Sequence, residues 1–414
     1  MGALPALPRA LAGLDAPIET KLHPPGARAE WVERSALIDE LAHTTAKLVL
    51  VDAPAGFGKT TLVAQWRSSP AENRAFAWVS LDRGDGDPRR LWWYIVSALT
   101  RACPDFDGEG IRQELRAQAP EFPASVLPML ANELAALCAP VVLVLDDYHM
   151  IKERHCHEQI RFLLAHLPPS AQIVIITRAD PPLPLARLRA AGEMAEIRAR
   201  ELRFTPEEAA KLIAAVAGIR LSAPGLGQLV ERTEGWPAGV YLAAISLRDH
   251  PSPYAFIDQF TGNNRFIVDF LAEEVLGRQP AEIQRFLART SLLARFCAPL
   301  CDAVTGTAGA AAIIEVLERE NLFLVPLDDN RQWYRYHHLF AQLLRSRLAR
   351  TEPALVTTLH ERASTWHEEA GQAEEAVQHA LAAADATRAV RLIARYWHAY
   401  VDSGRTATVS GWVR

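Results

Sequence analysis

The order of apolar and polar positions gives the first part of the chain the pattern of an α/β domain. Four short runs rich in β-branched residues, separated by segments of helical periodicity, lie at 48–53, 76–81, 141–147 and 173–178. Near-continuous apolar runs predict strands buried on both sides, so this alternation predicts a parallel sheet with helices on both faces. A short helix from Arg34 to about His43 is expected before the first strand.

After Arg200 the pattern becomes helical. Residues 205–208, Thr-Pro-Glu-Glu, offer a capping hydroxyl, a proline for the first helical position and a glutamate for a capping box. Helical periodicity continues to about Leu247, with a break at Gly235-Trp236-Pro237. We therefore predict a small helical domain here.

The region between about 280 and 350 combines helices with a hairpin signal. Helices are expected over 282–291 and 311–320, and from about His338 onward. The strand-like runs 323–327 and 333–336 flank the turn residues 328–330, Asp-Asp-Asn. Helices with a two-stranded ribbon predict a winged-helix domain.

Residues 353–400 have the pattern of antiparallel helices, with Gly371 where the first helix should end. One or two helix pairs are fewer than the roughly three repeats that a helical solenoid needs. We therefore expect the chain to be cut from a longer one.

The strand at 48–53 runs into a Gly-rich turn, and this turn predicts a nucleoside-triphosphate site. In a P-loop the backbone N–H groups surround the phosphates, the lysine (Lys59) reaches the β- and γ-phosphates, and the Thr60 hydroxyl ligates Mg²⁺. Ala53 replaces the first glycine of the usual pattern, which is the smallest possible change. The alternative is a turn that binds nothing. It is disfavoured because the strand before it and the amphipathic run after it are both present. The turn residues expected to bind nucleotide are Ala55, Gly56, Phe57, Gly58, Lys59, Thr60 and Thr61.

Two later strands end in residues that suit the same site. Asp146, at the end of VVLVLDD, is expected to hold Mg²⁺ opposite Thr60, and Asp147 to orient or deprotonate an attacking water. Arg178 follows the run IVIIT, where it could sense the γ-phosphate. Many parallel strands end in an aspartate, and an arginine at a strand end can also pair with a surface carboxylate. We therefore infer these roles from the combination with the P-loop.

Charge and composition exclude several other classes of function. The formal net charge of −5, from 44 basic and 49 acidic residues, provides no electrostatic footprint for nucleic acid. The N-terminus has no continuous apolar stretch of the signal-peptide kind, and no run approaches the roughly 20 apolar residues of a membrane span. We expect a chain that does not contact a membrane.

The five cysteines are odd in number and lack paired Cys-x-x-Cys spacing, so neither a disulfide framework nor a zinc site is expected. This fits a reducing, cytoplasmic location. His155-Cys156-His157 could suggest a metal site, but neighbouring residues on a helix point in different directions. A surface helix is therefore the favoured interpretation of that triplet.

Eight segments together resemble the STAND class of signal-transduction ATPases, and specifically the large ATP-dependent LuxR-type transcriptional regulators typified by the maltose-regulon activator. They are KLHPPGARAEWVERSALIDEL, APAGFGKTTL, VVLVLDDYHMI, IITRADPPLPLARLRA, ELRFTPEEA, TEGWPAGVYLAAISL, YRYHHLFAQLLR and HERASTWHEEAGQAEEAVQHAL, and they are distributed along nearly the whole chain, from Lys21 to Leu381. The resemblance implies an α/β P-loop NTPase domain, a helical domain, a winged helix and the start of an all-α helical arm. The implied division is an extended segment (1–29), the nucleotide-binding domain (30–200), the small helical domain (201–270), the winged helix (271–350) and the arm (351–414).

The resemblance also implies further ligands of a bound adenine nucleotide. Val32 and Arg34 match the segment that lies by the adenine, Pro237 matches the Gly-x-Pro proline that packs on the base, and His337 matches the winged-helix histidine that touches a phosphate. Taken alone, Gly235-Trp236-Pro237 is equally a helix break packed by an indole, and His337 an ordinary helix-start histidine. The adjacent His338 leaves the assignment open by one position.

Family members are longer and carry a complete helical sensor and a C-terminal helix-turn-helix, neither of which is in this sequence. The implied function is a switch with ATP/ADP and Mg²⁺ as cofactors. ADP holds the closed form, and an inducer bound beyond residue 414 favours ATP and an open, self-associating form. Slow hydrolysis through Asp147 then resets the switch. By itself the chain is not expected to bind DNA. The rival functions are a metabolic phosphotransferase, a ring-forming motor ATPase and a nucleotide-holding scaffold without hydrolysis.

Overall fold

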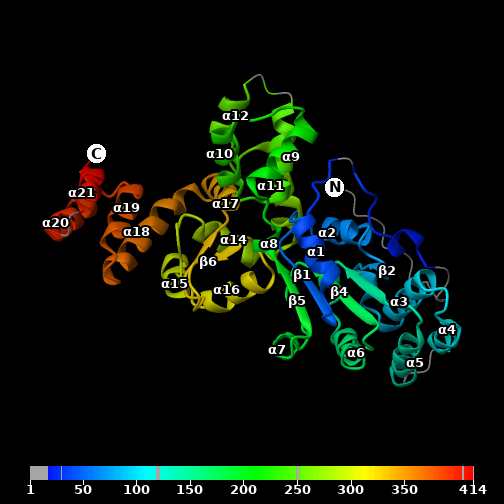
Figure 1. Cartoon of the computed structure of the whole chain (residues 1–414). Helices are drawn as coiled ribbons and strands as arrows, with labels where there is room; N and C mark the ends of the chain where they lie inside the picture. Colours follow the sequence, from blue (N-terminus) through cyan, green and yellow to red (C-terminus); the bar gives the residue numbers. More distant parts are fainter. Residues whose placement is uncertain are drawn as a thin grey trace, which may run out of the picture. The chain divides into compact units, whose positions relative to one another are not determined.

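The computed structural model describes residues 17–28, 30–117, 122–248, 250, 252–402 and 405–413 (Figure 1). The chain forms two compact units. The first unit ends at Val216 and also includes Trp236–Ala238, and the second unit comprises Ala217–Gly235 and the residues from Gly239 onward. Most of the expected extended segment, residues 1–16, lies outside the described residues. Within 17–28 the chain is not simply extended, because Glu19–Leu22 forms a 3₁₀ turn, η1.

A five-stranded parallel sheet forms the centre of the first unit. Its strands are β1 (Leu48–Asp52), β2 (Ala75–Ser80), β3 (Val141–Asp146), β4 (Ala171–Thr177) and β5 (Met194–Arg198), in the order β2-β3-β4-β1-β5. The parallel sheet predicted from the four apolar runs is confirmed. The fifth strand was missed because only Ile197 of its five residues is buried and Glu196 interrupts its apolar run.

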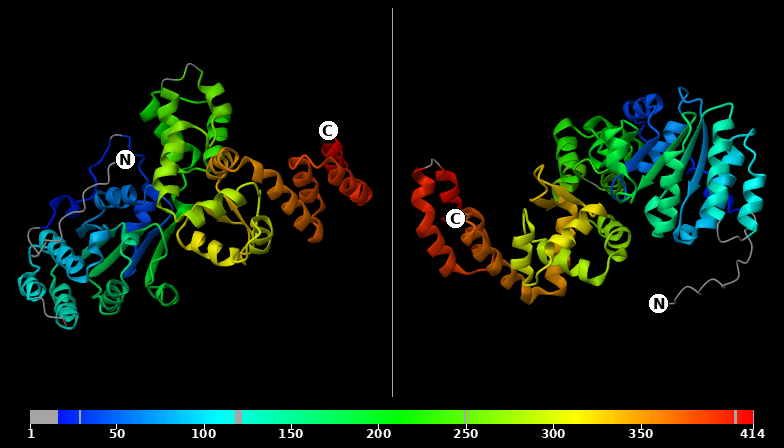
Figure 2. Two further views of the ribbon diagram at one scale, coloured as in Figure 1. Left: turned by 180° about the vertical axis from the view of Figure 1, so that it is seen from behind. Right: turned by 90° about the horizontal axis from the view of Figure 1, so that it is seen from below.

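Helices cover both faces of this sheet (Figure 2). Leu48 and Leu50 share one core with α3 (Pro88–Ala102), α4 (Glu109–Arg116), α5 (Phe122–Ala136), α6 (Arg154–Ala165) and α7 (Leu185–Ala190). Since successive side chains of a strand point to opposite faces, Val49 and Val51 lie on the other face. There α2 (Lys59–Arg67) places Trp66 edge-on against Phe76 of β2, with ring centroids 5.1 Å apart, and α1 (Ser35–His43) packs beside it.

The His155-Cys156-His157 triplet lies on α6, a helix with one exposed face and one face toward the core. His155 is exposed, whereas Cys156 and His157 are buried and face the core. The Nδ1 atom of His157 lies 2.8 Å from the hydroxyl of Tyr148, in the 3₁₀ turn η3 (Tyr148–Met150). In the described ranges of the chain, no group of three His, Cys, Asp or Glu residues could hold a metal ion.

Helices follow the sheet, as the sequence predicts: α8 (Ala199–Leu202), α9 (Pro206–Ala217), α10 (Ala223–Thr233), α11 (Pro237–Arg248), α12 (Pro253–Gln259) and α13 (Arg265–Glu274). The capping box at the start of α9 is present. The Glu208 N–H donates to the Thr205 hydroxyl (3.2 Å), and the Thr205 N–H donates to the Glu208 carboxylate (2.9 Å). The predicted break falls between α10 and α11, because Glu234 and Gly235 both have positive φ and Pro237 can only begin a new helix.

The next segment is a winged helix. It contains η4 (Leu276–Arg278), α14 (Ala281–Thr290), α15 (Ala298–Thr305), α16 (Ala310–Arg319), the antiparallel pair β6 (Leu324–Pro326) and β7 (Tyr334–Tyr336), and α17 (His338–Thr351). The sequence prediction lacked α15. Of the helices that the structure describes, none is singly long and apolar enough to cross a membrane. Only α15 and α16 meet that criterion jointly, and they are bent by 119°.

The helical arm comprises α18 (Pro353–Glu369), α19 (Ala373–Ala382), α20 (Ala386–Asp402) and α21 (Thr406–Val413). Gly371, with φ of 74°, follows the end of α18 as predicted. Three histidines, His360 and His367 on α18 and His379 on α19, meet between the first two helices. The Nδ1 atoms of His360 and His379 are 2.8 Å apart, and the rings of His367 and His379 are stacked with centroids 5.4 Å apart.

This histidine cluster should make the arm sensitive to acid. Burial, followed by the charges of His360 and His367, lowers the pKa of His379 to about 3. The unfolded chain therefore takes up a proton below the ordinary histidine pKa of about 6.5 while the folded arm does not, so stability present above about pH 6.5 is lost as the pH falls. His379 alone should cost about 1.4 kcal/mol at about pH 5.5. Burial also lowers the pKa of His360, with help from Arg345, and that of His367, which lies near Glu375 and Arg295.

Thermal unfolding followed by circular dichroism at about pH 7.5 and about pH 5.5 measures this loss. The variant His379→Gln should lose a smaller part of its stability on acidification than the original chain. His155→Gln, at a side chain that is 82% exposed, is the control and should not alter the pH dependence. An equal loss in His379→Gln and the original chain would contradict the assignment.

Candidate functional site

The carboxyl ends of the parallel strands bring the predicted site residues of the first unit to one edge of the sheet. Asp52 of β1 lies in register with Thr177 of β4 and with Arg198 of β5, and Asp146 ends β3 on the far side of β4. The Gly-rich turn leads from β1 directly into α2, whose first residue is Lys59. Gly56 and Gly58 both have φ of 76°, a left-handed conformation that favours glycine and lets the turn curl.

Lys59 is buried and points back into the turn. Its ammonium donates hydrogen bonds to the carbonyl oxygens of Ala53 (2.7 Å) and Pro54 (2.9 Å). Burial, and then the charge of Arg178, lower the pKa of Lys59 to about 8, against the opposing effect of nearby aspartates. The ammonium therefore lies within electrostatic reach of both Arg178 and the strand-end carboxylates, as the site prediction requires.

Thr60 and Asp146 are in direct contact. The Thr60 hydroxyl donates to Oδ1 of Asp146 (3.0 Å), and the same oxygen accepts the N–H of Asp147 (3.0 Å). Burial, and then the charge of Asp147, raise the pKa of Asp146 to about 7. A hydroxyl and a carboxylate side by side are the oxygen ligands that Mg²⁺ takes in P-loop proteins, so the residues fit that ion.

Asp147 is in the left-handed region with φ of 55°, which is uncommon for a residue other than glycine. Its side chain is 47% exposed, and one oxygen lies 3.8 Å from Nδ1 of His149. Arg178 follows β4 and is half-buried. The structure thus brings Asp147 and Arg178 to the same edge as Lys59, where water can reach the Asp147 carboxylate.

Two charged residues at this edge, Asp52 and Arg198, were not predicted from the sequence. Asp52 is 1% exposed and accepts a hydrogen bond from the Arg198 guanidinium (2.5 Å), which also contacts Asp180 (2.5 Å) and Glu196 (2.7 Å). Burial alone would lower the pKa of Arg198, but bonds to Glu196 and Asp180 and the charge of Asp52 raise it. Asp52 could have been predicted from its position at the end of a fully buried strand, which is the feature that identified Asp146.

Val32 and Arg34 lie in the segment before α1. The carbonyl of Val32 accepts a hydrogen bond from the Gln65 side chain of α2 (2.9 Å), and the Val32 side chain is buried. Arg34 donates to the carbonyls of Glu201 (2.9 Å) and Leu202 (3.0 Å) and pairs with Glu208 (2.9 Å). Arg34 therefore ties this segment to residues 201–208, and its predicted position by an adenine stays a prediction.

Pro237 is held against the P-loop by its two neighbours. The indole N–H of Trp236 donates to the carbonyl of Ala55 (3.1 Å), and the N–H of Ala238 donates to the carbonyl of Gly56 (3.0 Å). Trp236 is fully buried and Pro237 is also buried. A segment about 180 residues away along the chain thus contributes to the wall of the turn.

His337 belongs to the second unit and is 3% exposed. Its Nε2 atom lies 3.0 Å from the carbonyl oxygen of Thr233, and its ring meets Phe323 edge-on at 5.6 Å. The side chain of His338 is 60% exposed. The buried histidine of the pair is therefore His337, and its contact with a phosphate stays a prediction.

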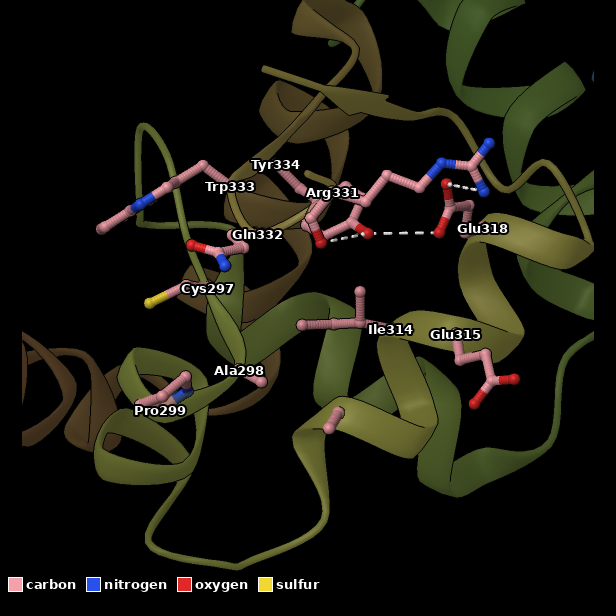
Figure 3. A pocket seen from close by; sticks show the side chains of 11 residues that line it. Cys297, Ala298, Pro299, Ile314, Glu315, Glu318, Arg331, Gln332, Trp333 and Tyr334 are labelled. Carbon is pink, nitrogen blue, oxygen red and sulfur yellow. Dashed lines mark hydrogen bonds and ion pairs between the residues drawn. The ribbon is translucent and has the colours of Figure 1, made fainter. Parts of the chain in front are cut away.

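The winged helix has a separate pocket of about 490 Å³, between the start of α15, α16 and β7 (Figure 3). Glu318 pairs there with Arg331 (3.2 Å) and accepts a hydrogen bond from the hydroxyl of Tyr334 (3.1 Å). Glu315 adds a second carboxylate to the lining. Two carboxylates in the lining make this pocket a poor site for phosphates.

The first strand of the parallel sheet leads through a left-handed glycine turn into a helix, and Lys59 and Thr60 lie near an aspartate from another strand. This arrangement defines a P-loop nucleotide-binding module. Comparison with known families agrees. Residues 42–183 match the AAA domain, and residues 272–356 match the MalT winged helix domain. The chain therefore combines these two domains in one MalT-like module.

Two curated proteins illustrate the relationship. The serine/threonine-protein kinase PknK of Mycobacterium tuberculosis is 34% identical over 90% of this chain, and the HTH-type transcriptional regulator MalT of Serratia proteamaculans is 34% identical over 89% of it. The chain spans only 34% and 41% of the lengths of those two proteins. Among solved structures, the Walker-type ATPase PABY2304 of Pyrococcus abyssi has a TM-score of 0.54 at 15% identity, covering 78% of this chain and 99% of that one, which shows the shared fold.

Proposed function

We propose that this chain is the adenine-nucleotide switch of a STAND-type transcriptional regulator, with ATP/ADP and Mg²⁺ as cofactors. The observation that carries the proposal is the contact of Thr60 with Asp146 (3.0 Å) beside the buried Lys59, at the end of a turn with two left-handed glycines. Phosphates, a divalent ion and a lysine are brought together in this way in P-loop proteins.

The P-loop and the neighbouring strand ends divide the binding of phosphate, metal ion and water between them. The backbone N–H groups of the turn, Ala55 to Thr61, surround the phosphates, and Lys59 exchanges the Ala53 and Pro54 carbonyls for phosphate oxygens. Thr60 and Asp146 hold Mg²⁺, which screens the phosphate charge. Asp147 orients the attacking water and Arg178 contacts the γ-phosphate, which together give a weak ATPase.

Contacts of the nucleotide with the other predicted residues would make the conformation of the chain depend on which nucleotide is bound. Val32, Arg34 and Pro237 would border the adenine, and His337 would contact a phosphate of ADP, so that ADP favours the closed form. ATP, and an inducer bound outside this chain, would favour the open, self-associating form because each would bind that form with higher affinity than the closed form. Similarity to the transcriptional regulator MalT over 89% of the chain supports a regulatory role.

The nucleotide that accompanies the purified chain tests the switch. We expect stoichiometric ADP on acid extraction and chromatography, with slow turnover of added ATP in the presence of Mg²⁺. Nucleotide-free protein with fast steady-state ATPase would favour a motor. Retained ADP without any hydrolysis would favour a scaffold. Folded protein that shows no calorimetric heat with ATP or ADP, and that holds no nucleotide, would refute the proposal.

Replacing Asp146 by asparagine should remove most of the benefit that Mg²⁺ gives to ATP binding. Asparagine has the same shape and can accept the Thr60 hydrogen bond, but it lacks the negative charge that a divalent ion needs. The ratio of ATP affinities with and without Mg²⁺ should fall roughly 10-fold. Asp39→Asn, at an exposed position on α1, is the matched control. Calorimetric titration with Mg²⁺ or EDTA measures both ratios, and an unchanged ratio in Asp146→Asn would exclude Asp146 as a metal ligand.

A further inference from the structure

The loop between α10 and α11 has an unusual backbone. Glu234 and the following Gly235 both adopt positive φ, 50° and 68°. Glycine takes this conformation freely, but a glutamate keeps it only where its surroundings hold it in place. Glu234 is the C-cap residue of α10, where its N–H donates to the carbonyl of Glu231 (3.2 Å), and its side chain is only 7% exposed.

The Glu234 carboxylate is bonded from the end of β7 and the start of α17. The Arg335 guanidinium donates to both oxygens of Glu234, with distances of 2.7 and 2.8 Å, and the N–H of His338 donates to the same carboxylate (2.9 Å). Beside it, Nε2 of His337 lies 3.0 Å from the carbonyl of Thr233. A bidentate, charge-assisted pair is among the strongest and most directional polar contacts in proteins.

The next residues of the same loop belong to the nucleotide-binding unit. Only Gly235 separates Glu234 from Trp236, whose indole N–H donates to the carbonyl of Ala55. Ala238 then donates its N–H to the carbonyl of Gly56. The segment from Glu234 to Ala238 is therefore bonded to the winged helix at one end and to the P-loop at the other, within five consecutive residues.

We propose that Glu234 and Arg335 are positioning residues through which the winged helix controls the shape of the P-loop. While their ion pair is intact, it fixes the backbone of Glu234 and Gly235 and so keeps the Trp236 and Ala238 donors aimed at the Ala55 and Gly56 carbonyls. When the winged helix releases Glu234, these donors lose their alignment, and the N–H groups of the turn lose their orientation toward phosphate. The effect on nucleotide rests on the proposed function, whereas the effect on the turn does not.

Glu234 is ionised at physiological pH, so its ion pair with Arg335 is present there. Burial alone would raise the pKa of Glu234, but the hydrogen bond from Arg335 and the charge of His337 outweigh burial and lower the pKa to about 2. Removing either partner leaves a buried charge without its counterion, which is more disruptive than removing both. A double-substitution cycle can therefore detect the pair.

The experiment compares Glu234→Gln, Arg335→Met and the double variant by hydrogen–deuterium exchange and by the rate of nucleotide release. We expect the Ala238 amide and the peptide over 53–61 to exchange roughly 10-fold faster in each single variant, with no further increase in the double variant. Nucleotide release should accelerate by a similar factor. The conservative variants Glu234→Asp and Arg335→Lys keep both charges and should show a smaller effect. They replace the neutral variants if those do not fold.

The matched control is the Arg289–Glu352 pair, which joins α14 to the residue before α18 at the same distance of 2.7 Å. Arg289→Met and Glu352→Gln should leave exchange at Ala238 unchanged. Folded Glu234→Gln and Arg335→Met with unchanged exchange at Ala238 would overturn the inference, as would an equal effect in the control pair. If the original chain binds no nucleotide, the proposed function fails but the exchange measurement still decides the role of the ion pair.

Discussion

Replacing Lys59 by methionine is expected to weaken the binding of ATP and ADP roughly 100-fold or more while the chain stays folded. Methionine keeps the apolar stem of the side chain but removes the ammonium, and with it two or more charge-assisted bonds to phosphate, worth about 1.5–3 kcal/mol each. The fold should tolerate the change because burial already disfavours this cation, as its pKa of about 8 indicates.

Calorimetric titration with each nucleotide measures the loss of affinity, and thermal unfolding without nucleotide checks the fold. Lys47→Met is the matched control. Lys47 immediately precedes β1, at the opposite end of that strand, where its ammonium pairs with Glu193 and is 34% exposed. The control should bind nucleotide normally. A folded Lys59→Met variant with unchanged affinity would place the phosphates elsewhere.

Replacing Trp236 by alanine is expected to lower the free energy of unfolding of the first unit by about 3–5 kcal/mol. The indole is fully buried, so its removal leaves a large cavity, and the carbonyl of Ala55 loses its donor. Trp236→Phe fills most of the cavity but lacks the N–H, so it isolates the hydrogen bond and should cost only about 1 kcal/mol.

Urea unfolding, followed by circular dichroism, measures these differences. Trp397→Ala, at a tryptophan of α20 that is 38% exposed, is the control and should change stability far less than Trp236→Ala. We also expect Trp236→Ala to retain less nucleotide on purification. Equal losses at Trp236 and Trp397 would show that the indole does not support the P-loop.

The parts of the fold that the sequence predicted are those with a strong local signal. The four predicted strands have near-continuous apolar runs, and the glycine turn and the capping box at Thr205 are defined by short patterns of residue types. Strand β5 lacks such a run because Glu196 interrupts it and only Ile197 is buried. Helix α15 was missed for a different reason, since its eight residues are too few to show a clear period.

Site residues could be predicted where one sequence motif contains several of them, as with Lys59 and Thr60. Asp146 could be predicted because it ends a strand of the same sheet as the P-loop strand. Contacts between distant segments could not be found in this way. Arg198 lies 146 residues from Asp52, and Arg335 lies 101 residues from Glu234. Nothing local distinguishes these arginines from the solvated ones, because their partners are set by the packing of whole elements.

The nucleotide-binding unit is discontinuous along the chain, and this bears on how it can be produced in isolation. A truncation that stops at Val216 would omit Trp236 and Ala238, leaving an indole-sized hole and two carbonyls without donors beside the phosphate turn. Such a fragment would be prone to aggregate, and its failure to bind ATP would say nothing about the intact protein. A soluble minimal fragment needs to extend past Arg248, the last residue of α11, or to carry the Trp-Pro-Ala tripeptide on a short engineered connection.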